Sequence, residues 1–206
     1  MGIEAVVFDI GNVLIAWQPE RFYDRVIGAK RRKEMFAEID LHAMNDEIDR
    51  GGDFYAVIAE TAAAHPHWRD EVMMWHDRWI DLASPKIDRS VRLLRALRRK
   101  GVPVFSLTNF GIGTFEIARR EYPFLEEFDE SFFSARLGVI KPDPVIYQIV
   151  EERSGLSGAQ LLFTDDRPDN IAAAAARGWQ VHRFERPSGW AAALVTAGLL
   201  TEEEAE

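Results

Sequence analysis

Polar side chains that could do chemistry follow four apolar segments of the sequence. Asp9 comes directly after "AVVF", and Thr108 and Asn109 come directly after "VFSL". Lys141 lies in "GVIKPDP", and the apolar segment "LLF" runs into "TDDRPDN", whose polar residues are Asp165, Asp166, Asp169 and Asn170. In an open parallel sheet, ligands bind beyond the carboxyl ends of the strands. We therefore expect these four groups to surround one site.

The residue types in these groups suit the transfer of a phosphoryl group. Asp165 and Asp166 are neighbouring carboxylates that repel each other, and a hard cation such as Mg²⁺ would relieve that repulsion. Asp9 is a candidate nucleophile, and a bound cation would orient the substrate and neutralise charge on it. The hydroxyl of Thr108 and the ammonium group of Lys141 are donors for phosphoryl oxygens.

The second half of the chain alternates short apolar segments with helical patterns. Strands are expected in "AVVF", "GVPVFSLTN", "ESFFSARLG", "QLLFTDD" and "GWQVHRF". Helices are expected to start at "SPKIDRS", with Ser84 as the cap, at "DPVIYQIVEERSG", with Asp143 as the cap, and at "DNIAAAAARG". This alternation predicts an α/β fold with a doubly wound parallel sheet, that is, a Rossmann-like core.

Residues 17–83 interrupt this alternation, because they show helical patterns without a convincing strand. We expect an all-helical cap over 17–83, inserted into a catalytic core made of residues 1–16 and 84–206. Four of the six tryptophans fall in this block or at its edge: Trp17, Trp68, Trp75 and Trp79. They are more typical of the bulky core of a small bundle than of an aromatic ligand surface.

Composition limits the classes of partner. The 206 residues are 47% hydrophobic and 29% charged, which is ordinary for a globular protein, and the chain has no cysteine. The net charge of −9 argues against nucleic acid as a partner, and no apolar run is long enough to cross a membrane. We expect a cytoplasmic protein that acts on a small phosphorylated molecule; nothing in the sequence indicates its oligomeric state.

In their order, the motifs "FDIGNVL", "SLTNFG", "GVIKPDP" and "FTDDRPDN" resemble those of the haloacid dehalogenase-like hydrolase superfamily. The similarity runs from about residue 3 to about residue 185, and the helical insertion resembles the smaller cap type of that superfamily. "DIGNVL" with Thr-Asn in the second motif looks most like a branch of sugar-phosphate phosphatases. That branch includes the α-D-glucose-1-phosphate phosphatases and lies near the phosphatase domain of soluble epoxide hydrolases.

The resemblance implies roles for the residues that contact the substrate. Asp9 would attack phosphorus and form an aspartyl-phosphate. Thr108 and Asn109 would hold the phosphoryl oxygens, and Lys141 would steady both Asp9 and the phosphate. The resemblance implies that the substrate is a small phosphomonoester and favours a sugar phosphate.

The resemblance also implies a magnesium site. Asp9, the backbone carbonyl of Gly11 and the side chain of Asp166 would bind Mg²⁺. Asp165 and Asn170 would lie behind these ligands rather than on the ion.

Gly11 departs from the superfamily's phosphatase pattern, in which a second Asp protonates the leaving group. Glycine offers a carbonyl but no proton, and general acid–base help is worth roughly 10²–10⁴ in rate. "MNDEIDRGGD" is expected to be a loop of the cap that supplies candidates, with Glu47 or Asp49 as the acid and Arg50 as a substrate contact. The alternative is that this stretch is an acidic loop exposed to solvent.

Two other functions remain open from the sequence. A 2-haloacid dehalogenase would use Asp9 to attack carbon and form an ester, and it needs neither a metal nor an acid at position 11. The paired acids Asp165 and Asp166 weigh against it, as does "DIGNV" where dehalogenases carry an aromatic-Gly-Thr segment. A non-catalytic binding module on the same fold is the third possibility, and the full set of polar motifs weighs against it.

Overall fold

A five-stranded parallel sheet forms the centre of the molecule. The computed structural model describes residues 2–206. The strands lie in the order β5 (Glu130–Phe133), β4 (Val104–Thr108), β1 (Ala5–Phe8), β6 (Leu161–Asp165) and β7 (Gln180–Arg183). In the register of the central strands, Phe8 lies opposite Ser106 of β4 and Thr164 of β6. The polar residues that follow β1, β4 and β6 therefore lie at one edge of the sheet, as expected for the doubly wound fold.

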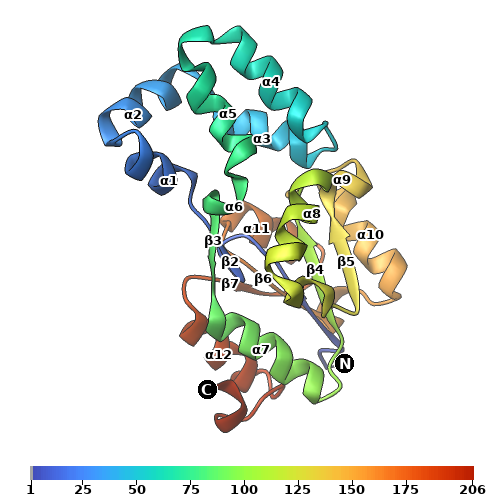
Figure 1. The fold of residues 1–206 in the computed structure, drawn as a ribbon. Coiled ribbons are helices and arrows are strands. Elements are labelled where there is room, and N and C mark those ends of the chain that lie inside the picture. The colour runs from blue at the N-terminus through green and yellow to red at the C-terminus, as the bar shows by residue number, and fades with distance from the viewer. Residues whose placement is uncertain (1) are drawn as a thin grey trace.

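Helices cover both faces of the sheet, which explains why its central strands are buried throughout and mainly apolar (Figure 1). Val6 and Phe8 of β1 belong to the core that includes α7 (Asp88–Arg99), α8 (Ile112–Glu121) and α12 (Pro187–Thr196). Ala5 and Val7 point the other way, into the core that includes α10 (Pro144–Ser154) and α11 (Pro168–Ala176). The short helix α9 (Ser134–Leu137) follows β5 directly. The fold class predicted from the sequence is confirmed.

Local signals located most elements of the core correctly, but one helix start was wrong. Asp143 caps α10, and its side chain accepts a hydrogen bond from Val145 N. Ser84 does not cap a helix: it lies in β3 (Ala83–Lys86), which pairs antiparallel with β2 (Ile15–Trp17). Helix α7 begins only at Asp88. The reason is non-local, since pairing with a segment about 70 residues earlier in the chain outweighs a local Ser-Pro signal.

Six helices lie together beyond the β2–β3 ribbon, coloured blue to green in Figure 1. They are α1 (Pro19–Val26), α2 (Ala29–Glu38), α3 (Leu41–Asp49), α4 (Phe54–Ala64), α5 (Arg69–Asp77) and α6 (Trp79–Leu82). Trp68 and Trp75 are buried among them, as predicted for the core of a bundle, whereas Trp17 and Trp79 line the cavity described below. The exact division of the chain at residues 17 and 83 stays a prediction, and β2 and β3 meet at these positions.

The prediction of a loop over "MNDEIDRGGD" was wrong, because most of it is the helix α3. The side chain of Asp40 caps this helix by accepting a hydrogen bond from Ala43 N. Leu41, Met44 and Ile48 recur at helical spacing and are buried. The acidic residues between them give α3 a polar face, which made the segment look like a solvated loop.

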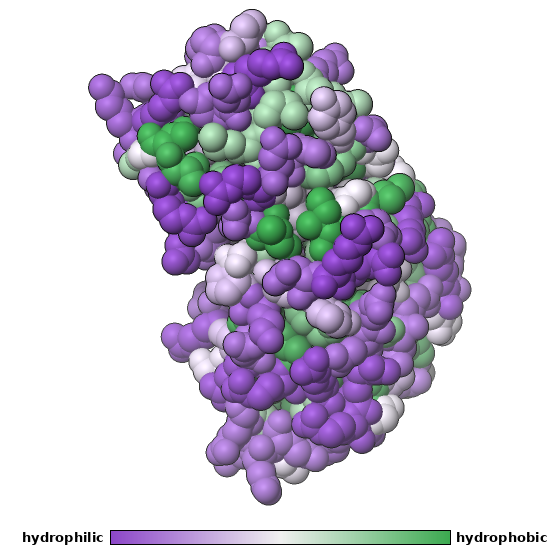
Figure 2. Space-filling view, in the orientation of Figure 1, coloured by the Kyte–Doolittle hydropathy of each residue, from purple (hydrophilic) through white to green (hydrophobic). Residues whose placement is uncertain are grey.

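Four 3₁₀ turns complete the chain: Pro66–Trp68, Pro123–Glu126, Gly158–Gln160 and Glu203–Ala205. The face shown in Figure 2 is mainly hydrophilic, with small groups of apolar side chains between the purple ones. Among residues 2–206, no helix has both the length and the apolar character that a membrane crossing requires.

Candidate active site

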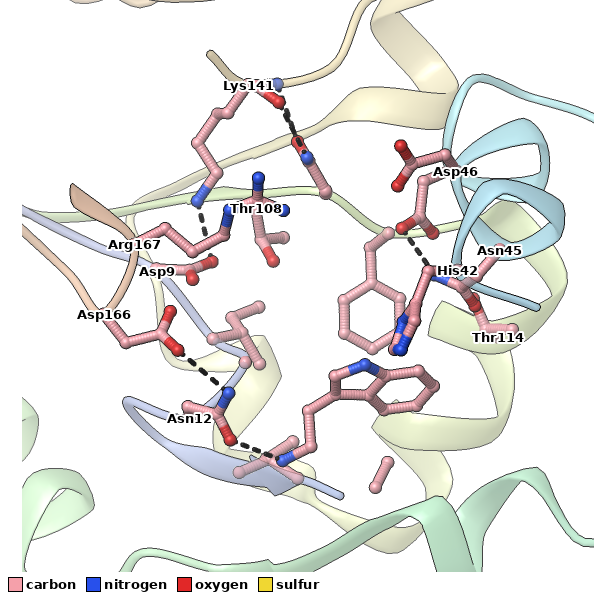
Figure 3. A pocket seen from close by; sticks show the side chains of 18 of the residues that line it. Asp9, Asn12, His42, Asn45, Asp46, Thr108, Thr114, Lys141, Asp166 and Arg167 are labelled. Atoms are coloured by element: carbon pink, nitrogen blue, oxygen red, sulfur yellow. Dashed lines mark hydrogen bonds and ion pairs between the residues drawn. The ribbon is translucent and has the colours of Figure 1, made fainter. Parts of the chain in front are cut away.

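A cavity of about 450 Å³ lies between the carboxyl ends of the central strands and helix α3. Seven of the residues predicted for the core site line it: Asp9, Gly11, Thr108, Asn109, Lys141, Asp166 and Asn170. Figure 3 shows Asp9, Lys141 and Asp166 on one side of this cavity and side chains of α3, among them Asn45 and Asp46, on the opposite side. The fold therefore brings together residues that are up to 161 positions apart in the sequence.

Lys141 is the buried centre of the core half of the site. Its ammonium group lies 2.8 Å from Asp9 Oδ1 and 2.6 Å from Asp165 Oδ2, and donates to Leu107 O at 2.7 Å. Burial by itself lowers the pKa of Lys141, but the charges of Asp165 and Asp9 outweigh burial and raise the pKa above its ordinary value. Lys141 is therefore held as a cation between two carboxylates.

Asp165 is enclosed by partners and has no exposed surface. Its Oδ1 accepts from the backbone N–H of Arg167 at 2.8 Å, and both its oxygens are 3.0 Å from Asn170 Nδ2. Together with the bond from Lys141, these contacts occupy both carboxylate oxygens. Asp165 therefore anchors Lys141, and Asn170 anchors Asp165; their place behind metal ligands stays a prediction.

Asp166 is half-buried and faces the cavity beside Asp9. One carboxylate oxygen from each of Asp9, Asp165 and Asp166 falls within a 4.8 Å cluster. Asp165 is already saturated, so Asp9 and Asp166 are the carboxylates that remain available to a cation. With three acids and one lysine the cluster is one of net negative charge, and it fits a divalent cation that prefers oxygen ligands.

Asn12 orients Asp166 and was missed in the sequence. Its Nδ2 donates to Asp166 Oδ2 at 2.9 Å, and its Oδ1 accepts from Trp17 N at 2.9 Å (Figure 3). The residue has φ 55°, a left-handed conformation that Asn tolerates better than most residues. The signal was the "GN" pair shortly after the first strand, because Asn at that point favours such a turn.

Asp9 is buried at the end of β1. Burial raises its pKa to about 7, the charge of Lys141 opposes this shift, and the charges of Asp165 and Asp166 add to it. A cation bound beside Asp166 would lower the pKa of Asp9 again and hold the carboxylate in the ionised form that a nucleophile needs.

Thr108 is the last residue of β4 and Asn109 follows it, and the two occupy different positions in the site. Thr108 is buried and lines the cavity. The side chain of Asn109 forms two bonds with the backbone of Lys141: its Nδ2 donates to Lys141 O at 3.0 Å, and its Oδ1 accepts from Lys141 N at 2.8 Å. Asn109 thus ties the segment carrying Lys141 to the end of β4, a positioning role that its sequence motif did not reveal.

The structure separates the three cap candidates. Asp49 is the last residue of α3, is 7% exposed and lines the cavity. Glu47 and Arg50 are exposed and do not line it. The helical phase of α3 explains the difference, since Asn45 and Asp49 lie four residues apart on the face toward the cavity.

Asp49 also lies where α3 contacts the core. Its backbone carbonyl accepts from Ser134 Oγ at 2.5 Å, and Ser134 Oγ accepts from Phe110 N at 2.9 Å. Gly111 permits this approach, because a Cβ at that position would lie 2.5 Å from Ile48 Cγ2. The absence of a side chain at Gly111 lets the cap close against the core.

Arg167 is a further cavity residue that the sequence motifs did not single out. Its guanidinium group is bound to Asp169, with Nη2 2.7 Å from Asp169 Oδ2. Asp46 of the cap raises its pKa further, after the larger effect of Asp169. The cavity therefore has a cation on its core side and an acid on its cap side.

The sequence also matches a known family over most of its length. The family described as haloacid dehalogenase-like hydrolase matches residues 3–178. The chain belongs to that family. The superfamily resemblance drawn from the four motifs is confirmed, and the particular branch stays a prediction.

Individual relatives of this hydrolase carry two different activities. The sesquiterpene phosphatase AstK of Aspergillus oryzae is 27% identical over 85% of this chain and 86% of its own length. A HAD family enzyme from Bacteroides thetaiotaomicron, solved in complex with magnesium and inorganic phosphate, is similar with a TM-score of 0.66 and 21% identity, over 90% of this chain and 96% of its own. L-2-haloacid dehalogenase from Xanthobacter autotrophicus, solved with chloropropionic acid covalently bound, has a TM-score of 0.62 and 19% identity over 96% and 84%.

Proposed function

We propose that this hydrolase is a Mg²⁺-dependent phosphatase that cleaves a small phosphomonoester. Asp9 attacks phosphorus, the bond to the ester oxygen breaks, and an aspartyl-phosphate forms while the electron pair leaves on the alcohol oxygen. Water then attacks the same phosphorus atom, the bond to Asp9 breaks, and inorganic phosphate is released. Lys141 holds Asp9 in place, and Thr108 donates to a phosphoryl oxygen.

Asp9, the Gly11 carbonyl and Asp166 would hold Mg²⁺. When bound, the cation neutralises charge on the phosphoryl oxygens and orients them toward Asp9. Asn12 keeps the Asp166 carboxylate turned toward this place through its 2.9 Å bond. The protein's own residues thus pre-orient the ligands, and the magnesium and phosphate bound by the Bacteroides thetaiotaomicron enzyme support the proposal.

The observation that carries the proposal is Asp166, a carboxylate beside Asp9 that remains available to a cation. Attack on a carbon–halogen bond uses a single carboxylate, and a neighbouring anion would raise the energy of that attack. In this cavity Asp166 lies beside Asp9 and is oriented by Asn12. This arrangement favours a cation-assisted phosphatase over a dehalogenase, although both activities occur among the relatives.

The cap half of the cavity supports a hydroxylated leaving group, such as that of a sugar phosphate. Asn45 and Asp46 present polar atoms there, and Trp17 and Trp79 add aromatic surface. The volume of about 450 Å³ lies in the range of small-molecule sites. Aromatic planes with hydrogen-bonding groups beside them suit a sugar ring.

The test is phosphate release from p-nitrophenyl phosphate and a panel of sugar phosphates, with Mg²⁺ and with EDTA. We expect release that needs Mg²⁺ and is lost in Asp9→Asn. Asp143→Asn is the matched control, because Asp143 is an exposed helix cap outside the cavity and asparagine also caps helices.

The same proteins are tested for halide release from 2-chloropropionate. Halide release that is indifferent to EDTA would overturn the proposal in favour of a dehalogenase. If neither phosphate nor halide is released by the wild-type chain, the proposal also fails, and a binding module is the remaining alternative.

A further inference from the structure

Cleavage of an alkyl phosphate produces an alkoxide that needs a proton, and Gly11 has no acidic side chain that could supply it. The cavity contains five aspartates: Asp9, Asp40, Asp46, Asp49 and Asp166. Asp9 is the proposed nucleophile and Asp166 a proposed metal ligand. Asp40 is exposed and caps α3, and Asp46 keeps 44% of its side chain exposed, beside Arg50. Asp49 is the one that is both buried and free of these tasks.

Asp49 is held in place from two sides. Its Oδ2 accepts from Asn45 Nδ2 at 2.9 Å, and Asn45 Oδ1 accepts from Trp75 Nε1 at 3.3 Å. On the core side, Ser134 holds its backbone carbonyl. Asn45 occupies Oδ2 and leaves Oδ1 without a hydrogen bond from another side chain.

The surroundings of Asp49 favour its protonated form. Burial is the largest cause and the charge of Asp46 adds to it, as does the more distant charge of Asp9; the backbone N–H of Gly111 and the charge of Arg50 oppose them. The pKa is raised to about 7 as a result. The C-terminal end of α3 also disfavours an anion. No lysine or arginine in the described part of the chain forms an ion pair with Asp49.

We propose that Asp49 is the general acid of this site, delivered by the cap and replacing the acid that position 11 lacks. This inference rests on the proposed phosphatase function. As Asp9 bonds to phosphorus and the ester P–O bond breaks, the electron pair stays on the ester oxygen, which takes the proton of Asp49 and leaves as the alcohol. The Asp49 carboxylate then takes a proton from the water that attacks the aspartyl-phosphate; the bond between Asp9 and phosphorus breaks, which restores protonated Asp49 and the Asp9 carboxylate.

The test compares leaving groups in the first turnover of Asp49→Asn. p-Nitrophenolate is stable without a proton, so we expect its first-turnover release to stay within about tenfold of the wild type. Release of the alcohol from glucose 6-phosphate should fall roughly 10²–10⁴-fold. Glu47→Gln is the matched control: it is an exposed acid of the same helix outside the cavity, and both rates should be unchanged.

A rescue variant separates chemistry from structure. Gly11 has room for a side chain, since its nearest neighbour to a built Cβ is Trp17 Cβ at 4.0 Å. When Gly11→Asp is added to Asp49→Asn, the rate on glucose 6-phosphate should be at least tenfold higher than in Asp49→Asn alone. If Asp49→Asn does not fold, the wild-type enzyme can be tested instead with a series of aryl phosphates. If the site has a proton donor, the rate should depend only weakly on the basicity of the leaving group.

Three results would overturn the inference while leaving the phosphatase proposal intact. They are an unchanged rate on glucose 6-phosphate in Asp49→Asn, an equal loss on both substrates, and a steep dependence of the wild-type rate on leaving-group basicity. Absence of phosphate release by the wild-type protein from every substrate would instead refute the phosphatase proposal itself.

Discussion

Replacing Lys141 by methionine should destabilise the protein more than the loss of any surface lysine. Lys141 is 2% exposed, and its ammonium group lies 2.8 Å from Asp9 and 2.6 Å from Asp165. Methionine fills similar space but leaves two carboxylates without their cation. Removing one partner of a buried ion pair costs about 3–5 kcal/mol. A loss of about 4 kcal/mol lowers the folding equilibrium constant roughly 10³-fold.

The assay is urea unfolding of Lys141→Met between pH 5 and 8. Lys141 lowers the pKa of Asp9, so without Lys141 this pKa rises further and the folded state binds protons more tightly than the unfolded state. The loss of stability of Lys141→Met relative to the wild type should therefore become smaller as pH falls. Lys100→Met is the control: Lys100 pairs with Glu204 at 2.9 Å on the surface, and its loss should cost at most about 1 kcal/mol.

A second variant tests whether the cost is electrostatic. Lys141→Met combined with Asp165→Asn removes one of the stranded charges, so it should be more stable at pH 8 than Lys141→Met alone. The reasoning is refuted if Lys141→Met costs no more than Lys100→Met, or if the second substitution adds a further loss at pH 8.

Three other predictions concern Asn12, Gly111 and Asp49. Asn12→Gly keeps the left-handed backbone but removes the bond to Asp166, so the Mg²⁺ concentration for half-maximal phosphatase activity should rise roughly 10–100-fold; an unchanged Mg²⁺ titration would contradict this. Gly111→Ala places a Cβ 2.5 Å from Ile48 Cγ2, so urea unfolding should show a loss of about 1–3 kcal/mol and turnover should fall, whereas Gly2→Ala, with nothing within 4 Å, should change neither. The pKa of Asp49 is raised from 3.8 to about 7, so its burial destabilises the folded state progressively as pH rises from 4 to 8. Over that range, Asp49→Asn should therefore gain stability relative to the wild type, by at most about 4 kcal/mol in urea unfolding. An equal difference in stability at pH 4 and pH 8 would show that Asp49 does not titrate in this way.

The strands and most core helices could be predicted because their signals are local. An apolar run that ends in a polar residue marks each central strand, and an Asp-Pro pair marks the start of α10. Ser84 misled for the same reason: it has the local character of a helix cap, but its segment pairs with β2. The acidic stretch of α3 looked like a loop because its polar face hides the buried positions between.

The site residues divide in a similar way. The motifs identified Asp9, Thr108 and Lys141 because each follows an apolar segment, and the sheet brings such ends together. They did not identify Asn12, or the positioning role of Asn109. Those roles consist of hydrogen bonds to residues 32 or more positions away, and neither the "GN" pair nor the Thr-Asn motif shows which residue is the partner.

The sequence alone determined which chemical groups this hydrolase has: a strand-end carboxylate at Asp9, a glycine with no acidic side chain at position 11, and paired acids where β6 ends. Only the tertiary structure decided how equivalent groups divide their tasks. Asp165 is saturated by Lys141 and Asn170, whereas Asp166 stays open to the cavity. Asp49 and Glu47 differ in the same way, because burial and orientation depend on the phase of α3 against the core. A carboxylate's chemistry follows from those surroundings, which the residue type does not specify.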